Sequence, residues 1–378
     1  MKYKIAIFAF GKAWGGVEKL VAWLVRELTN DFDFTILTPT PKEECVIKNI
    51  KLITYKEGDT LSLSNILKKE KFDIVYVPRS LDKTQIEYIR ALRASQQDTK
   101  FIAGIHVPIN IFYIDSAKRY NPDLIFSMAD AVHLISNAPK NIELIPQEYR
   151  DKIEVIENLV KEERIAFDQE SFRLRILSAG RLSVEKNFNL LVQLAYKFKI
   201  NKKDIGITIY GDGPEKNKLI RLSKIFGVQD FIIFKKHSDE WQKNIRYGDV
   251  FVCSSYYEGY GMALAEAVAA GIPGIAFDFT QGPCSILNAK NGILLSGQPT
   301  VEKLYSAVLK LEDRQKYDEL FRQNGDKFDN ERILEKWRGL FNRISLKRNS
   351  EISKFRDCNL IDEQDLTLGK IKVLKVVE

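Results

Sequence analysis

Short apolar runs alternate with amphipathic segments along the first part of the chain. Runs of four to seven residues rich in Ile, Val and Phe are typical of strands that are buried on both faces of a sheet. The predicted strands are residues 4–10, 34–37, 51–55, 74–77, 101–105, 132–135 and 153–156. Helical periodicity between them predicts helices at 17–28, 61–69 and 84–94. This alternation predicts a parallel sheet with helices on both faces.

The same alternation of apolar runs and amphipathic segments begins again after a charged segment at 161–172. The second set of predicted strands is 174–179, 205–210, 231–234, 250–253, 274–277 and 293–295, with helices at 262–270, 302–311 and 333–346. The charged segment is therefore interpreted as a linker. The fold class is α/β, with two Rossmann-like domains at 1–165 and 166–345, and a tail at 346–378 that the pattern does not assign.

Composition fits this two-domain interpretation. A chain of 378 residues exceeds one ordinary core, and 45% hydrophobic with 29% charged residues describes a soluble globular protein. Its apolar runs all fall short of the roughly 20 residues that a membrane-spanning helix needs. The four cysteines show no C-x-x-C spacing, which argues against a zinc site and favours a reducing, cytoplasmic location.

Positive charge is concentrated in the second half. Residues 171–378 carry 34 basic and 26 acidic side chains, whereas residues 1–170 carry 24 and 25. A basic half suits an anionic ligand such as a nucleoside diphosphate, or an acidic membrane surface. We do not expect nucleic acid as a partner, because no nucleic-acid-binding module accompanies the charge.

The candidate chemistry centres on residues 249–277, which predict a strand, a glycine-bearing turn, a helix and a second strand. Gly259 and Gly261 allow the backbone to approach a ligand, and the free N–H groups of the following helix suit an anion. Glu258 and Glu266 bracket this turn. Glu266 lies in an otherwise apolar helix, where an unpaired charge is costly, so we expect it to have a partner or a ligand.

Three further segments place polar or glycine residues at predicted strand ends, where parallel sheets bind ligands. Arg181 and Lys186 follow the strand at 174–179 and could neutralise a diphosphate, although loop cations are usually only solvated. Gly211 lies in a G-D-G-P turn that is first of all architectural, and Gly15–Gly16 could equally form an ordinary tight turn. His106 ends the strand at 101–105; His133 is interpreted as a strand residue satisfied within the fold.

The run E-G-Y-G-M-A-L-A-E-A-V-A-A-G-I-P resembles the E-x7-E signature of retaining glycosyltransferases of the GT-B fold, glycosyltransferase family 4. The G-G-V-E-K and G-R-L-S-V-E-K segments are similar to loops of the same family. The resemblance implies two domains that face each other across a cleft, with the last helices crossing back to the first domain. It implies transfer of a sugar from a nucleoside diphosphate sugar, with UDP favoured, to a saccharide or lipid-linked acceptor in surface polysaccharide or glycoconjugate synthesis.

The resemblance also assigns residues. It implies catalytic roles for His106, Glu258, Arg181 and Lys186, with Glu258 orienting the donor sugar and Glu266 holding the ribose. The implied donor-binding residues are Gly15, Gly16, Arg181, Lys186, Gly211, Glu258, Gly259, Tyr260, Gly261, Met262, Ala263 and Glu266. Neither a metal nor a cofactor is expected, since cations and a helix N-terminus can serve the diphosphate.

Departures from the family pattern limit what carries over. E-N-L at 157–159 replaces a P-N-G turn, Lys235 and Lys236 replace a glycine, and Cys284 and Ser285 replace a charged pair. The alternatives are a sugar-nucleotide epimerase or phosphorylase on the same fold, or a non-catalytic sugar-nucleotide-binding subunit.

A lipid-linked acceptor would require peripheral membrane contact. Lys118, Arg119 and Tyr120, which follow the apolar run 109–114, could provide that contact; a buried or active-site loop explains the run equally well.

Overall fold

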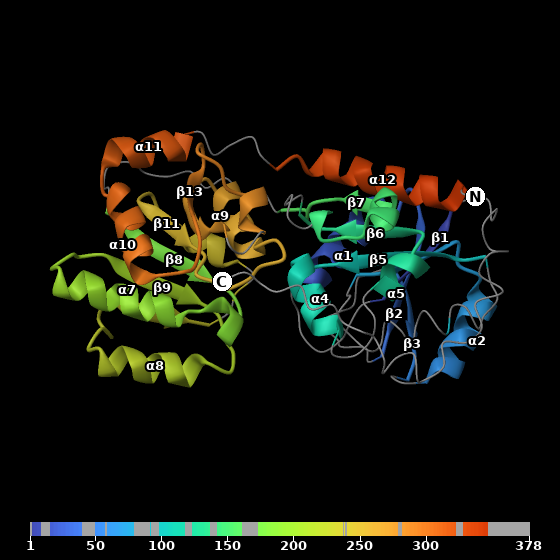
Figure 1. Ribbon diagram of the computed structural model, residues 1–378, viewed down its shortest axis with the longest axis horizontal. Coiled ribbons are helices and arrows are strands. Elements are labelled where there is room, and N and C mark those ends of the chain that lie inside the picture. The colour runs from blue at the N-terminus through green and yellow to red at the C-terminus, as the bar shows by residue number, and fades with distance from the viewer. Residues whose placement is uncertain are drawn as a thin grey trace. The chain divides into compact units, whose positions relative to one another are not determined.

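The first half of the chain builds a seven-stranded sheet in which every pairing is parallel, in the order β3-β2-β1-β4-β5-β6-β7 (Figure 1). The structure is a computed structural model that describes residues 2–8, 16–39, 50–56, 59–78, 91, 98–117, 123–136, 142–160, 173–236, 238, 240–278, 282–322 and 328–346. The strands are β1 (Lys4–Phe8), β2 (Asp33–Thr38), β3 (Lys51–Thr54), β4 (Ile74–Val77), β5 (Lys100–Ile105), β6 (Ala131–Leu134) and β7 (Ile153–Val155). The apolar runs form the central strands, as β1 and β4 are almost wholly buried.

Helices of this first unit pack apolar side chains against the sheet. They are α1 (Gly16–Leu28), α2 (Thr60–Glu70), α4 (Ile109–Ala117), α5 (Asp123–Met128) and the distant α12 (Asn330–Leu346). In α1 the buried side chains recur at three- and four-residue spacing, from Leu20 to Leu28, as an amphipathic helix requires. The two compact units of the chain are Met1–Glu157 with Glu331–Glu378, and Asn158–Asn330.

Helix α12, drawn in orange-red in Figure 1, belongs to the first unit although it comes from the end of the described chain. Trp337 is fully buried and its ring lies 5.2 Å from that of Tyr76 in β4. Arg338 donates to Asp31 at 2.9 Å, and Lys336 donates to Glu157 at 2.7 Å. The core of the first unit is therefore closed by residues more than 170 positions away in sequence.

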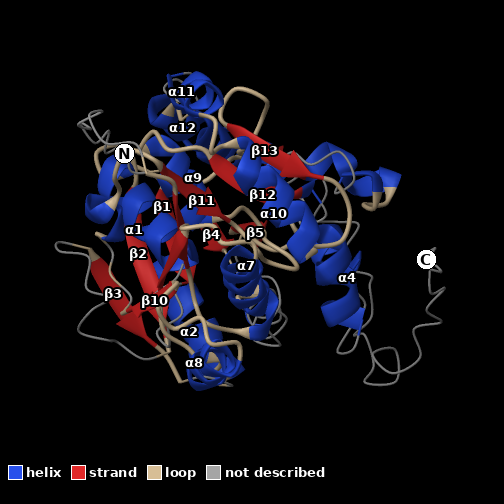
Figure 2. Ribbon diagram, turned by 90° about the vertical axis from the view of Figure 1, so that its left-hand side faces the viewer, coloured by secondary structure: helices blue, strands red, loops and turns tan. Residues whose placement is uncertain are grey.

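The second unit contains a six-stranded parallel sheet in the order β10-β9-β8-β11-β12-β13. Its strands β10, β11, β12 and β13 are labelled in Figure 2. Its strands are β8 (Arg175–Ala179), β9 (Gly206–Tyr210), β10 (Ile232–Lys235), β11 (Asp249–Val252), β12 (Gly274–Phe277) and β13 (Gly292–Leu295). Its helices are α7 (Asn189–Ile200), α8 (Lys216–Ile225), α9 (Met262–Ala269), α10 (Val301–Lys310) and α11 (Arg314–Arg322). Side chains of α7, α10 and α11 share one apolar core with the strands.

The predicted strands are confirmed to within one or two residues, and the parallel pairing follows the predicted alternation. The apolar run 109–114, for which membrane contact and a buried or active-site loop were both considered, begins helix α4. Ile109 and Phe112 of this helix, three positions apart, both enter the core. The helix at 84–94 (apart from Ala91), the linker at 161–172, residues 118–120 and the tail beyond 346 lie outside the described residues. None of the helices in the described ranges has the length and apolar character needed to cross a bilayer.

Candidate functional site in the second unit

The turn between β11 and α9 carries the largest group of predicted donor-binding residues, from Glu258 to Ala263. Gly261, which precedes the first turn of α9, has a φ of +99°, in the left-handed region that favours glycine. A Cβ at Gly282 would lie 2.8 Å from the carbonyl oxygen of Glu258 and 2.7 Å from that of Tyr260. The turn at Gly282 therefore packs so closely against the backbone of Glu258 and Tyr260 that only glycine fits at position 282.

Glu258 and Lys186 are brought together from two strand ends. The Lys186 Nζ donates to Glu258 Oε1 at 2.6 Å, and the two side chains are 25% and 13% exposed. Burial alone would lower the pKa of Lys186, but the Glu258 carboxylate outweighs burial and leaves that pKa raised. Lys186 is therefore a charged ammonium at neutral pH, held in place next to the turn.

Small side chains of the β11–α9 loop fix the same two residues. Ser255 Oγ donates to Glu258 Oε1 at 2.8 Å, and Ser254 Oγ donates to the backbone carbonyl of Lys186 at 2.9 Å. The Cys253 thiol lies 3.9 Å from the same carboxylate oxygen; burial, and then the Glu258 charge, raise its pKa to about 12. Cys253 is thus a neutral thiol that packs beneath the carboxylate.

Arg181 and Gly211 lie on two neighbouring strand ends. The Arg181 side chain is exposed, and within the described part of the chain its guanidinium has no hydrogen-bond or ion-pair partner. A Cβ at Gly211 would lie only 2.0 Å from the carbonyl oxygen of Gly180, so the two turns pack backbone against backbone. This contact explains Gly211 as an architectural residue that holds the Arg181 loop in position.

Glu266 has the partner that its apolar surroundings demand. It is 7% exposed on α9, and its Oε2 accepts a hydrogen bond of 3.1 Å from Trp241 Nε1. The Trp241 indole also packs against Tyr210 and Phe251, with ring centroids 5.9 and 5.5 Å away. The motifs of the sequence did not point to Trp241; an indole in the polar segment S-D-E-W-Q-K was the available signal.

Asn158 is a second residue that the motifs did not identify. Its Nδ2 lies 3.3 Å from the sulfur of Met262, the first residue of α9, while its Oδ1 is buried with no hydrogen-bond partner among the described residues. The asparagine that E-N-L shares with the family's P-N-G turn thus lies against the predicted donor-binding turn.

The remaining predicted residues lie in the first unit. His106 ends β5, is half-buried, and its Nε2 lies 3.2 Å from the Tyr76 hydroxyl. His133 is fully buried between the Tyr76 hydroxyl at 2.9 Å and the Ile156 carbonyl at 2.8 Å, which confirms that it is satisfied within the fold. Gly16 opens α1, and Gly15 lies outside the described residues.

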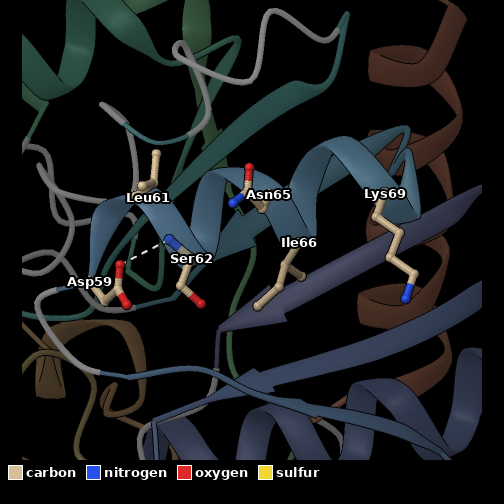
Figure 3. A pocket seen from close by; sticks show the side chains of 6 residues that line it. All are labelled: Asp59, Leu61, Ser62, Asn65, Ile66 and Lys69. Atoms are coloured by element: carbon tan, nitrogen blue, oxygen red, sulfur yellow. Dashed lines mark hydrogen bonds between the residues drawn. The ribbon is translucent and has the colours of Figure 1, made fainter.

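A separate hollow lies along α2 and includes none of these residues (Figure 3). It is lined by Asp59, Leu61, Ser62, Asn65, Ile66 and Lys69. The Asp59 carboxylate caps the helix by accepting from the Ser62 N–H at 2.9 Å. Its acidic group is thus already used by the helix terminus.

No group of three or more His, Cys, Asp or Glu side chains in the described ranges is arranged to hold a metal ion. The polar groups that do converge, on Glu258 and Lys186, carry opposite charges and lie beside a helix start. Such a site suits a ligand with both hydroxyl and phosphate groups.

Comparison with known proteins agrees with this geometry. Residues 161–328 match the family Glycosyl transferases group 1. AmsD of Erwinia amylovora, an amylovoran biosynthesis glycosyltransferase, is 24% identical over 356 residues, which cover 90% of this chain and 100% of AmsD. The GtfA subunit of a Streptococcus gordonii UDP-N-acetylglucosamine–peptide N-acetylglucosaminyltransferase is 36% identical over 121 residues, 32% of this chain and 24% of that relative. The match thus spans about a quarter of GtfA.

The fold is shared with solved structures. Anabaena HepE, solved with UDP and glucose, superposes with a TM-score of 0.73 over 90% of this chain and 100% of HepE, at 14% identity. Two parallel sheets flanked by helices are the common architecture. The chain has the α/β GT-B fold, and residues 161–328 carry a Glycosyl transferases group 1 domain.

Proposed function

We propose that this chain is a retaining glycosyltransferase that transfers a sugar from a nucleoside diphosphate sugar to a hydroxyl of a saccharide or lipid-linked saccharide acceptor. The observation that carries the proposal is the Lys186–Glu258 pair at the β11–α9 turn, within the domain that matches Glycosyl transferases group 1. The ammonium faces the diphosphate, and the carboxylate orients sugar hydroxyls. Retention of configuration follows from the resemblance to family 4.

Different residues of the site bind different parts of the donor. Arg181 and Lys186 neutralise the diphosphate as the glycosidic bond breaks, and the start of α9 adds backbone N–H groups. Glu266, held by Trp241, binds the ribose hydroxyls. These groups provide the charge that a divalent cation provides elsewhere, so the reaction proposed here is metal-independent and needs no cofactor.

UDP is the first choice of nucleotide, and a guanosine diphosphate is the second. HepE was solved with UDP, and GtfA carries UDP-N-acetylglucosamine in its name. AmsD takes part in amylovoran biosynthesis, which supports a role in surface polysaccharide or glycoconjugate synthesis. The sugar is a hexose or an N-acetylhexosamine.

A thermal-shift screen of nucleotide sugars identifies the donor, because a ligand that binds only the native state raises the unfolding temperature. Release of UDP from that donor is then measured with and without oligosaccharide or lipid-linked acceptors. We expect release that depends on acceptor, and a product with the anomeric configuration of the donor by NMR. An inverted product would refute retention, and interconversion of the nucleotide sugar without acceptor would favour an epimerase.

A non-catalytic sugar-nucleotide-binding subunit is the competing function. It would keep affinity for the donor yet show no turnover by the isolated chain. The paired Lys186 and Glu258 favour catalysis, since a binding protein needs no cation placed where negative charge develops on a leaving diphosphate.

We further propose a cytoplasmic enzyme with peripheral membrane contact through Lys118, Arg119 and Tyr120. Binding to vesicles should require anionic lipid, weaken as salt screens the charges and drop in the Lys118→Ala, Arg119→Ala double variant. Sedimentation that is equal with neutral and anionic vesicles would favour a soluble acceptor instead.

A further inference from the structure

Helices α7 and α8 of the second unit end side by side (Figure 1). The Tyr196 ring of α7 stacks on the ring of Phe226, the residue that follows α8, with centroids 5.2 Å apart. Nearby, the Lys199 ammonium donates to the Gly227 carbonyl oxygen at 2.7 Å. These two contacts hold the helix ends together, so the exposed side chains around them form one continuous surface.

Large apolar side chains of both helix ends are exposed to solvent. Ile225, the last residue of α8, is 77% exposed, and Ile200, the last residue of α7, is 57% exposed. Tyr196 lies one turn before Ile200 on the same side of α7 and is also exposed. Single exposed apolar residues are ordinary, but a group of them gathered at one pair of helix ends marks a contact surface.

Positive charge surrounds these apolar side chains. The segments 196–204 and 216–230 carry eight Lys or Arg and two Asp or Glu, whereas the whole chain has 58 and 51, so these segments account for most of its positive excess. Three of the eight cations are exposed and have no side-chain partner in the described part of the chain. These cations and the apolar residues define the α7–α8 surface: Tyr196, Ile200, Lys202, Arg221, Lys224 and Ile225.

The charge of the α7–α8 surface is not balanced by acids of the same segments. The other five cations are paired: Lys197 with Glu302, Lys203 with Glu312, Lys216 with Asp212, Lys218 with Glu215, and Lys199 with the Gly227 carbonyl. Of the two acids, Asp204 pairs with Arg173. Asp230 alone, an exposed residue, remains against three unpaired cations within the described segments. The α7–α8 surface is therefore both apolar and positively charged.

We infer that the α7–α8 surface binds an anionic lipid bilayer, with its cations at the phosphates of the headgroups and Ile200 and Ile225 inserted beneath them. An apolar side chain gains free energy by leaving water, and each basic side chain near an anionic membrane adds attraction. Tyrosine is favoured at the level of the headgroups because it combines an apolar ring with a polar hydroxyl. This surface belongs to the second unit and is distinct from the contact proposed through residues 118–120.

Other occupants match the α7–α8 surface less well. In a two-fold dimer the same patch faces itself, so a second copy would bring Arg221 and Lys224 against like charges. Nucleic acid would use the cations for its phosphates but would leave Ile200 and Ile225 without an apolar partner. Anionic lipid supplies both the opposite charge and an apolar layer.

The α7–α8 surface and the Lys186–Glu258 pair lie at opposite edges of the second sheet. Lys186 and Glu258 follow the carboxyl ends of β8 and β11, whereas α7 and α8 lead into the amino ends of β9 and β10. A helix between two parallel strands carries the chain from one edge of the sheet to the other. The inference therefore does not rest on the proposed function, and binding to lipid is measured without any donor or turnover.

Sedimentation of the full-length protein with vesicles tests the cations. Phosphatidylcholine vesicles with and without phosphatidylglycerol are compared. The Arg221→Ala, Lys224→Ala double variant should bind the anionic vesicles about tenfold to thirtyfold more weakly than the wild type. Lys290→Ala, Lys310→Ala is the matched control, since it removes the same charge from exposed positions of the same unit, and it should bind like the wild type. Equal binding of the two double variants would overturn the inference.

The apolar contribution has its own pair of variants. Ile225→Ser should weaken binding to anionic vesicles by about threefold to tenfold, because a side chain that inserts among lipids is lost. Leu61→Ser in α2 changes a leucine that is 74% exposed and should have no effect. Both variants should unfold at the wild-type temperature, since both side chains are exposed. Binding that is unchanged by Ile225→Ser would contradict insertion.

A background variant separates this surface from the one at residues 118–120. Binding to anionic vesicles should persist in Lys118→Ala, Arg119→Ala and fall again when Arg221→Ala and Lys224→Ala are added. Complete loss in the first double variant would overturn the inference. Analytical ultracentrifugation without lipid checks the other occupant: a dimer that Ile225→Ser dissociates would assign the surface to a second copy and would also overturn it.

Discussion

Lys186 Nζ lies 2.6 Å from Glu258 Oε1, although 72 positions separate the two residues in sequence. One is assigned to the diphosphate and the other to the donor sugar, and the contact ties these two side chains together. Under the proposed function, a phosphate of the donor would bind an ammonium that has a carboxylate partner. The two roles must be energetically coupled.

The first prediction is that coupling. Lys186→Ala and Glu258→Gln should each slow turnover by about 10- to 1000-fold, the scale of a lost electrostatic contact in the transition state. The double variant should be much less than multiplicatively impaired, because either single change already breaks the pair. Steady-state kinetics measures all four proteins. Strictly multiplicative losses would contradict the coupling, and near-normal activity of Lys186→Ala would remove it from the site.

A second prediction separates Arg181 from surface arginines. Arg181→Ala should lower turnover by about 10- to 1000-fold and leave the unfolding temperature unchanged, because its exposed guanidinium has no partner in the described structure to lose. Arg173 is the matched control: it is also exposed and pairs with Asp204 at 2.7 Å. Arg173→Ala should keep full activity, since exposed pairs contribute little. Equal activity of the two variants would rule out the diphosphate role of Arg181.

A third prediction concerns nucleotide binding. Glu266→Gln should weaken binding of bare UDP, and Trp241→Phe should do so to a smaller extent, since the indole N–H orients the carboxylate without touching the ligand. Glu258→Gln should leave UDP affinity intact or slightly higher, because Lys186 loses its competing partner. Calorimetry decides between these outcomes. Equal loss of UDP affinity in Glu266→Gln and Glu258→Gln would show that the two acids do not serve different parts of the donor.

The fourth prediction is a pH dependence of stability. The pKa of His133 is lowered to about 4 when folded, against an ordinary value of 6.5, so the unfolded chain binds protons first as the pH falls. The free energy of unfolding should therefore decrease between about pH 6.5 and pH 4, by up to about 3 kcal/mol from this residue. Urea unfolding across this range measures the total, and histidine NMR gives the pKa of His133 itself. An ordinary pKa for His133 would contradict the prediction.

The sequence predicted the strands well because a parallel sheet buried on both faces needs continuous apolar runs, as in β1 and β4. Helix α4 was not predicted, because its own residues are mostly apolar and show no amphipathic period. In the site, Glu266 was expected to have a partner, but nothing local could name Trp241, which reaches it from a segment without regular periodicity. The contacts of Tyr76 with His106 and His133 were equally hidden, since they depend on which strands are neighbours in the sheet. The sequence pattern thus predicted the helices and strands, whereas the hydrogen-bond partners of the site residues depend on the tertiary structure.

The return of α12 to the first unit bears on the order in which the protein forms during synthesis. The second unit, Asn158–Asn330, is continuous in sequence, whereas the first lacks Trp337 and Phe341 of its core until the last helix has left the ribosome. Domains usually fold from the N-terminus onward as they emerge. Here the later domain can be complete first, while the earlier one waits for α12. We expect a released chain that is truncated before residue 331 to protect the 158–330 region from protease and to leave residues 1–157 sensitive.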